Sequence, residues 1–194
     1  MCRHPYNLID AKGNKIALNS HLLSLKDLNQ GNNIKQLIDA GITSLKIEGR
    51  LKDINYVKNI ISYYRKKIDE ILLSEPKYTK ASSGKTLIKF EPDTERSFNR
   101  LNTEYFLHER EKELVNKYSP KSMGKRIGNV DKIGENFITV KSNDKFHNGD
   151  GLCFISNNEL KGIRDEKVIN DKIYINDMSS IKNGLELYRK YDNE

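Results

Sequence analysis

The stretch that decides the fold is Thr43-Ser44-Leu45-Lys46-Ile47-Glu48-Gly49-Arg50. Its first six residues predict a short β-strand, and helical segments lie on both sides of it. The order helix, strand, helix is typical of a parallel α/β sheet or barrel. In such a barrel the carboxyl ends of the strands face the active site, so Glu48 and Arg50 are expected where a ligand binds.

Both flanking segments have helical signals. Residues 34–40 carry apolar residues on one face, Asn33 can cap them, and Gly41 is expected to end the helix. A long helix is predicted to start near Asp53. Its apolar stripe is expected to face a core and consists of Ile54, Val57, Ile61, Tyr64, Ile68 and Ile71.

Residues 1–73 supply too few units for a complete barrel. Residues 6–10 and 15–18 predict a β-hairpin around a glycine turn, and Ser24 is expected to start a helical turn containing Lys26, Asp27 and Leu28. A closed eight-fold barrel needs roughly 250 residues. We therefore expect residues 1–73 to be the C-terminal piece of a TIM-like (β/α) barrel, unable to fold alone because strand edges and an apolar face stay uncovered.

The second half of the chain predicts a different architecture. Residues 74–84 are rich in Pro, Lys, Ser and Gly, which indicates a linker, and residues 86–90 are a candidate strand. Within an accessory domain of residues 85–194, short β-rich runs separated by turn residues predict a small antiparallel β-barrel or sandwich. These runs are 127–133, 137–141, 152–155, 168–174 and 185–189, with the clearest turn at 148–151.

Composition places the chain among polar globular proteins. Hydrophobic residues make up 36% and charged residues 31%, and the net charge is +7. Residues 1–80 carry six of these positive charges, with 14 Lys and Arg against 8 Asp and Glu. This excess fits an RNA partner, although a solvated lysine-rich surface explains it equally well. With neither a secretory signal nor a membrane-spanning run in the sequence, a cytoplasmic location and no membrane partner are expected.

Several common catalytic sites have no counterpart in the sequence. The four histidines form no HExxH motif, and no Gly-x-Ser-x-Gly elbow or glycine-rich phosphate loop occurs. Cys2 and Cys153 are far apart, so neither a disulfide framework nor a zinc site is predicted. Cys153 lies in a predicted strand and is expected to be a buried structural thiol.

Two constellations remain as candidate sites. Arg50 could clamp a carboxylate or phosphate, and Glu48 could orient Arg50 or act as an acid or base; an ordinary Glu–Arg pair at a strand end is the alternative. Cys2-Arg3-His4-Pro5-Tyr6 places a thiol beside a guanidinium and an imidazole, which suits a nucleophile or a metal ligand. A frayed chain end is the alternative for this second stretch.

In their order along the chain, these stretches resemble the end of the peptidase U32 (collagenase-like) family domain. The matching parts are Cys2–Tyr6, Leu22–Leu28, Ala40–Lys52 and Tyr56–Arg65. Further stretches resemble the accessory domain of the family's long members: Phe98–Arg100, Tyr105-Phe106, Ser119–Lys121, Ile127-Gly128, Asn148–Leu152 and Leu187–Arg189. In one departure, Leu101-Asn102 follows Asn99-Arg100 where the family pattern has a glycine and then an aromatic residue.

The resemblance implies a chemistry that residue spacing does not show. Family members were named collagenase-like proteases, yet several are similar to hydroxylases of transfer or ribosomal RNA that use a four-cysteine iron–sulfur cluster and prephenate as an oxygen donor. Cys2 matches the last of those four cysteines. The chain begins one residue before it, so we expect the other three, with the missing N-terminal barrel portion, to lie upstream, and this fragment alone to be inactive.

Three functions are therefore considered. The leading one is a partial U32 enzyme whose complete form modifies tRNA or rRNA, with Glu48, Arg50 and Lys46 in catalytic roles. Arg3, Tyr6 and Lys26 are its substrate-binding candidates, and Cys2 is its cluster ligand. The second is a peptidase of unassigned catalytic type. The third treats residues 85–194 as a non-catalytic module that binds RNA or protein.

Overall fold

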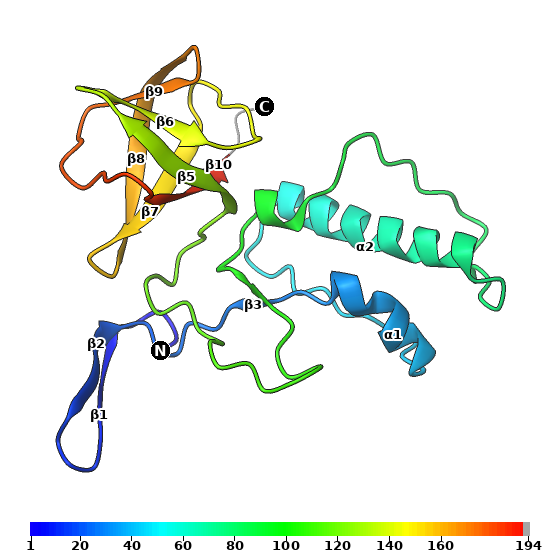
Figure 1. Ribbon diagram of the computed structural model, residues 1–194. Coiled ribbons are helices and arrows are strands. Elements are labelled where there is room, and N and C mark those ends of the chain that lie inside the picture. Colours follow the sequence, from blue (N-terminus) through cyan, green and yellow to red (C-terminus); the bar gives the residue numbers. More distant parts are fainter. Residues whose placement is uncertain (192–194) are drawn as a thin grey trace.

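The structure, a computed structural model, describes residues 1–191, without the side chains of residues 164–166 and 191. The chain has two unlike parts, a loosely packed region of residues 1–123 and a β-barrel (Figure 1). The elements of the first are β1 (Tyr6–Ile9), β2 (Lys15–Ser20), β3 (Asp27–Leu28), a 3-10 turn (Gly31–Asn33), α1 (Ile34–Asp39), α2 (Ile54–Ser74), a second 3-10 turn (Thr94–Arg96) and β4 (Asn102–Thr103). Those of the barrel are β5 (Lys125–Ile133), β6 (Phe137–Lys141), β7 (Gly151–Ser156), β8 (Glu159–Ile169), β9 (Lys172–Ile175) and β10 (Glu186–Tyr191).

In the first half of the chain, the structure confirms three predictions that rest on local sequence signals. β1 and β2 pair antiparallel as the predicted hairpin, which projects from the rest of the chain (Figure 1). Gly41 ends α1 with φ +90°, a conformation that glycine adopts without strain. Asp53 caps α2, and its carboxylate accepts a hydrogen bond from the backbone N–H of Tyr56 at 2.7 Å. Asn33 precedes α1 but makes no side-chain cap there.

This cap gives a direct prediction for α2. Replacing Asp53 with Ala leaves the N–H of Tyr56 without its acceptor and is expected to cost about 1 kcal/mol of helix stability. At room temperature about 1 kcal/mol corresponds to about a fivefold change in an equilibrium constant. Amide hydrogen exchange in the first turn of α2 should therefore accelerate about fivefold. Asp53→Asn keeps a capping oxygen and serves as the control. Equal exchange in the Ala variant and in the wild type would contradict the role of the cap.

Three predicted elements are wrong. Residues 43–48 and 86–90 belong to no strand in the structure, and the predicted helical turn at Lys26–Leu28 is instead the short strand β3. A parallel strand exists only where a neighbour supplies its hydrogen bonds, and among the described residues none lies beside 43–48. The apolar stripe of α2 is consequently incompletely covered, since Ile54 is 63% exposed and Ile61 49% exposed.

The segment between α2 and the barrel packs on the first part of the chain. β4 pairs in parallel with β3, and Asn59 donates a hydrogen bond to the carbonyl of Asp93 at 2.6 Å. The backbone N–H of Asn116 bonds to the carbonyl of Ser24 at 2.8 Å. Lys77 contacts Asp39 of α1 at 2.9 Å, within the stretch predicted as a linker. Residues 93–116 therefore belong structurally with residues 20–60.

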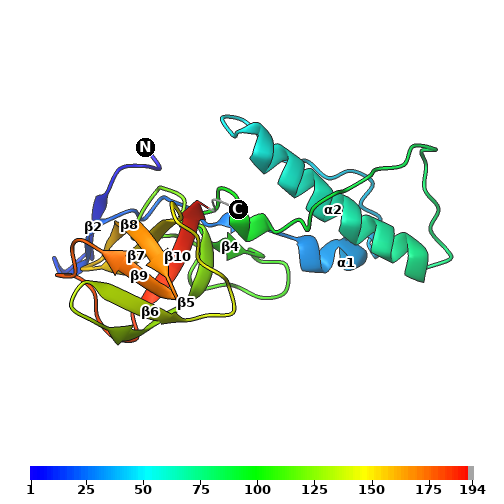
Figure 2. The ribbon, with the colours of Figure 1, turned by 90° about the horizontal axis from the view of Figure 1, so that it is seen from above.

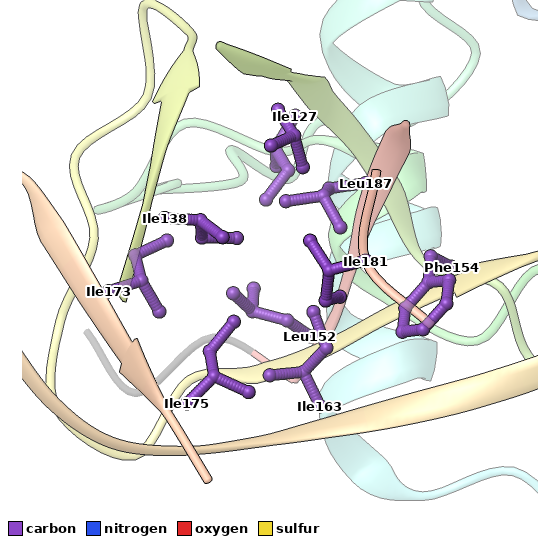
Figure 3. Close-up of a cluster of buried hydrophobic side chains, with 10 residues drawn as sticks. Ile127, Ile138, Leu152, Phe154, Ile163, Ile173, Ile175, Ile181 and Leu187 are labelled. Carbon is purple, nitrogen blue, oxygen red and sulfur yellow. The ribbon is translucent and has the colours of Figure 1, made fainter. Parts of the chain in front are cut away.

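The barrel is closed, with the strand order β10-β5-β6-β9-β8-β7 and antiparallel pairing throughout. Inward-facing side chains fill it (Figure 3). The core consists of Ile127, Val130, Ile138, Leu152, Phe154, Ile163, Ile173, Ile175, Ile181 and Leu187. The predicted run at 168–174 is wrong as a single strand, because Asn170 and Asp171 both have positive φ and turn the chain between β8 and β9.

A small second cluster joins the barrel to the rest. Met123, Cys153 and Tyr188 are buried together, and Leu101 packs against them. Cys153 is the buried structural thiol that the sequence predicted; burial raises its pKa to about 11. In two views the barrel and the helices α1 and α2 lie at opposite ends of the molecule (Figures 1 and 2).

Candidate functional site

A cavity of about 730 Å³ lies between the two helices and the segment around residues 94–102. Its apolar walls come largely from α1, α2 and residues 45–47, which include Ile34, Leu37, Leu45, Ile47, Ile60 and Ile68. Its charged lining consists of Arg3, Lys46, Arg50, Lys52, Arg65 and Arg100 against Asp27 and Glu48. Six cations against two carboxylates leave four positive charges in excess, so the cavity favours an anionic ligand with an apolar body.

An ion pair between distant segments shapes one wall. The backbone N–H of Arg100 donates to Asp27 Oδ2 at 2.7 Å, and its guanidinium donates to Asp27 Oδ1 at 2.8 Å. Both side chains are about two-thirds buried or more. Because Asp27 lies on β3 and Arg100 just before β4, this pair and the two-residue ladder fix the register of the two segments together.

Lys52 is the cation most enclosed by aromatic rings. Its Nζ lies 2.9 Å from the centroid of the Phe98 ring and 5.3 Å from that of Tyr56. Burial lowers the pKa of Lys52 below its usual range and raises the pKa of Tyr56. Such a contact holds the ammonium group in place by the attraction of the ring faces for a cation, so Lys52 is a fixed rather than a free charge.

The backbone is strained directly beside both Lys52 and Arg100. Leu51, which precedes Lys52, has φ +59°, and Leu101, which follows Arg100, has φ +70°. A leucine in this region costs about 1–3 kcal/mol and persists only where the surroundings impose it. At Leu101, where the family pattern has glycine, packing against Met123 and Tyr188 compensates for the strain. Strain of this kind gathers at ligand sites more often than elsewhere.

Four of the residues predicted from sequence line this cavity together, namely Arg3, Lys46, Glu48 and Arg50. All four are exposed, and Glu48 accepts a hydrogen bond from the backbone N–H of Arg50 at 3.1 Å. Glu48 thus shapes the turn at Gly49-Arg50 from the cavity rim.

The other three predicted residues are not among the lining side chains. Cys2 is exposed, the Tyr6 hydroxyl donates to the carbonyl of Met1 at 3.0 Å, and Lys26 pairs with Glu111 at 3.5 Å.

Sequence reasoning missed Asp27, Lys52, Tyr56 and Arg100 as site residues. Lys52 and Asp27 lie inside the stretches that carry the family resemblance, and Arg100 in its Asn-Arg motif, so the signal was present. Asp27 and Arg100 meet although they lie 73 residues apart, and residue spacing does not show such a contact. Tyr64 also lines the cavity, and its hydroxyl accepts a hydrogen bond from the backbone N–H of Gln30 at 3.2 Å.

The chain's own residues do not fit a complete iron–sulfur cluster. Among the side chains that the structure describes, no three of His, Cys, Asp or Glu gather closely enough to hold a metal ion. Cys153 is buried in the barrel, where its thiol donates to the carbonyl of Met123 at 3.3 Å. Since such a cluster needs four ligands, this chain can offer one thiolate, that of Cys2.

Comparison with known proteins gives a consistent pattern. The family model described as "Peptidase family U32" matches residues 1–117. The chain is 39% identical over 193 residues to the 23S rRNA 5-hydroxycytidine C2501 synthase of Escherichia coli (strain K12), covering 100% of this chain and 28% of that protein. It is 45% identical over 74 residues to the tRNA hydroxylation protein P1 of Bacillus subtilis (strain 168), covering 35% of this chain and 18% of that protein.

The chain thus spans less than a third of either of these relatives. No solved structure matches it. In the part of the chain that the structure describes, every helix is too short or too polar to cross a lipid bilayer.

Proposed function

Because this chain belongs to peptidase family U32, we propose that it is the RNA-handling part of a larger enzyme that hydroxylates RNA, with ribosomal RNA as the substrate class. The observation that carries the proposal is the 39% identity to an rRNA hydroxycytidine synthase, which extends through the cavity and the whole barrel. The match to the tRNA hydroxylation protein covers only 35% of the chain, so ribosomal RNA is favoured over transfer RNA. The cationic cavity agrees with a polyanionic or carboxylate ligand.

The catalytic body of this enzyme is proposed to need a further segment. Residues 1–107 expose many large apolar side chains, among them Leu51 (87%) just before α2 and Ile54 (63%) and Ile61 (49%) in the first half of α2. A patch of this kind on a stable protein is normally covered. We propose that the TIM-like barrel portion encoded elsewhere in the complete enzyme packs there and that residues 43–48 pair with it as a strand.

An iron–sulfur cluster belongs to the same proposal. In the complete enzyme, Cys2 would supply one thiolate and the missing portion three, while prephenate would be the oxygen donor. The cluster would supply redox chemistry that no protein side chain provides. The roles left to this chain are to present the thiolate of Cys2 at the exposed end and to hold an anion among Arg3, Arg50 and Lys52.

The test uses the complete enzyme and ribosomal RNA from cells that lack it. Mass spectrometry of the digested RNA is expected to detect one added oxygen on a cytidine after incubation with the wild type. Lys52→Ala is expected to lower that yield at least tenfold, since it removes the best-fixed cation of the cavity. Lys58→Ala, on the exposed side of α2, serves as the charge-matched control.

Two results would refute the proposal. One is unmodified ribosomal RNA alongside modified transfer RNA, which would shift the substrate class. The other is cleavage of gelatin by the complete enzyme that Glu48→Gln abolishes, which would instead support the peptidase interpretation.

A further inference from the structure

The barrel carries a row of outward-facing side chains across three neighbouring strands. Phe137 of β6 is the direct cross-strand partner of Tyr174 of β9, and Tyr174 is in turn the partner of Lys167 of β8. Their neighbours in sequence, Ile138, Ile173 and Ile175, point into the core. Alternation along each strand therefore places the two aromatic rings and the ammonium group together on the outer surface.

The ring of Phe137 is held rigidly from several sides. Its centroid lies 5.8 Å from that of Tyr174, and the Nζ of Lys172 lies 4.4 Å from it. A Cβ at residue 134 would come within 2.2 Å of the ring, so Gly134 is what allows Phe137 to lie against the β5–β6 turn. Phe137 is thereby enclosed and supports Tyr174, whose ring remains available.

A hollow of about 470 Å³ opens beside Tyr174. It is lined by Asn136, Lys167, Tyr174, Ile175 and Asn176, which combine one aromatic ring, one cation and two amides. Of the described barrel residues, the large apolar side chains that stay exposed are Ile133 (41%) and Ile169 (38%). Ile169 is the cross-strand partner of Lys172, so this apolar surface adjoins the aromatic row.

We propose that this hollow binds an unpaired base of single-stranded RNA, stacked on Tyr174, with Lys167 and Lys172 at the flanking phosphates. The inference rests on the proposed function in taking RNA as the ligand. Proteins bind single strands through aromatic side chains on which bases stack and through cations that follow the backbone, and amide groups read base edges. A double helix keeps its bases inside the stack and cannot place one against Tyr174.

An acidic peptide is the alternative ligand to consider for a surface that carries Lys167 and Lys172. It would use the ammonium groups but would gain little from an exposed tyrosine ring and two amides. The combination of ring, cations and amides in one hollow favours a nucleotide, which has a flat π face, an edge with hydrogen-bonding groups and a charged backbone.

The experiment measures fluorescence anisotropy of a labelled single-stranded RNA dodecamer titrated with the 194-residue chain. Tyr174→Ala is expected to weaken binding roughly 5- to 100-fold, the range for loss of one stacked base, whereas Tyr174→Phe keeps the ring and stays within about twofold. Lys167→Ala should lower the slope of log affinity against log salt by about 0.7, the value for one phosphate contact on a single strand. Lys190→Ala, an exposed lysine on β10, serves as the charge control and should leave affinity within about twofold.

The outcomes separate this inference from the proposed function. Equal affinity of the wild type and Tyr174→Ala, with the barrel folded by circular dichroism, would overturn the hollow as an RNA site, as would tighter binding of duplex RNA or of an acidic peptide. Neither result changes whether the complete enzyme hydroxylates RNA. Conversely, the complete enzyme could bind RNA through Tyr174 and yet hydroxylate no RNA. That result would support the hollow as an RNA site and would refute the proposed reaction.

Discussion

Replacing Gly124 with Ala is expected to destabilise the barrel by at least about 3 kcal/mol. Gly124 connects the first part of the chain to β5 and has φ +77°. A Cβ there would lie 2.0 Å from the carbonyl oxygen of Arg189, a backbone atom of β10 that cannot rotate away. The substitution therefore combines backbone strain with a clash that only separation of β5 from β10 could relieve.

Gly184 provides a matched control for this prediction. It has nearly the same conformation, φ +76°, but no atom lies within 4 Å of a Cβ built on it. Gly184→Ala should therefore cost only the strain, about 1 kcal/mol. Urea denaturation followed by circular dichroism measures both variants. If both variants lost the same free energy of unfolding, the contact between Gly124 and β10 would be less tight than in the structure.

Sequence alone predicted the elements whose signals are local. β6 at Phe137–Lys141 was predicted with its observed bounds, and α2 begins one residue after the expected position at Asp53. In each case the deciding interaction joins residues a few positions apart, such as the cap from Tyr56 to Asp53. Sequence reasoning sees such contacts because chain connectivity already brings their partners together.

Turn chemistry was present in the sequence but was not used. Asn157 and Asn158, with φ +52° and +62°, form the two-residue turn between β7 and β8, and Asn170-Asp171 does the same between β8 and β9. Pairs of Asn and Asp in positive φ are the usual signal of tight hairpins. Applying that rule would have separated β8 from β9 and extended β8 back to Glu159.

Other features lay beyond any local rule. Residues 43–48 form no strand in the structure, because no segment among the described residues lies beside them to supply hydrogen bonds, and local propensity alone does not make a strand. The meeting of Asp27 with Arg100 depends on a chain path of 73 residues. Consequently the rim residues Glu48 and Arg50 were predicted, whereas the cations fixed by long-range contacts, Lys52 and Arg100, were not.

Replacing Asp150 with Ala is the second large effect expected, a loss of about 3–5 kcal/mol. The Asp150 carboxylate is fully buried and lies 3.2 Å from Nε of Arg189, whose side chain is only 4% exposed. It also accepts a hydrogen bond from the backbone N–H of His147 at 3.1 Å. Without it, the buried Arg189 guanidinium loses this carboxylate, and the 147–150 turn loses the contact that Asp150 makes to β10.

A second substitution distinguishes a charge effect from simple loss of packing. If the loss of this buried charge pair is the cause, adding Arg189→Met to Asp150→Ala also removes the guanidinium that Asp150 faced, and the double variant should be more stable than Asp150→Ala alone. Arg126→Ala breaks the exposed pair with Glu186 in the same barrel and should leave the urea midpoint close to that of the wild type. A double variant less stable than both single variants would show that Asp150 and Arg189 contribute through packing instead, because removing the two charges together would then bring no recovery.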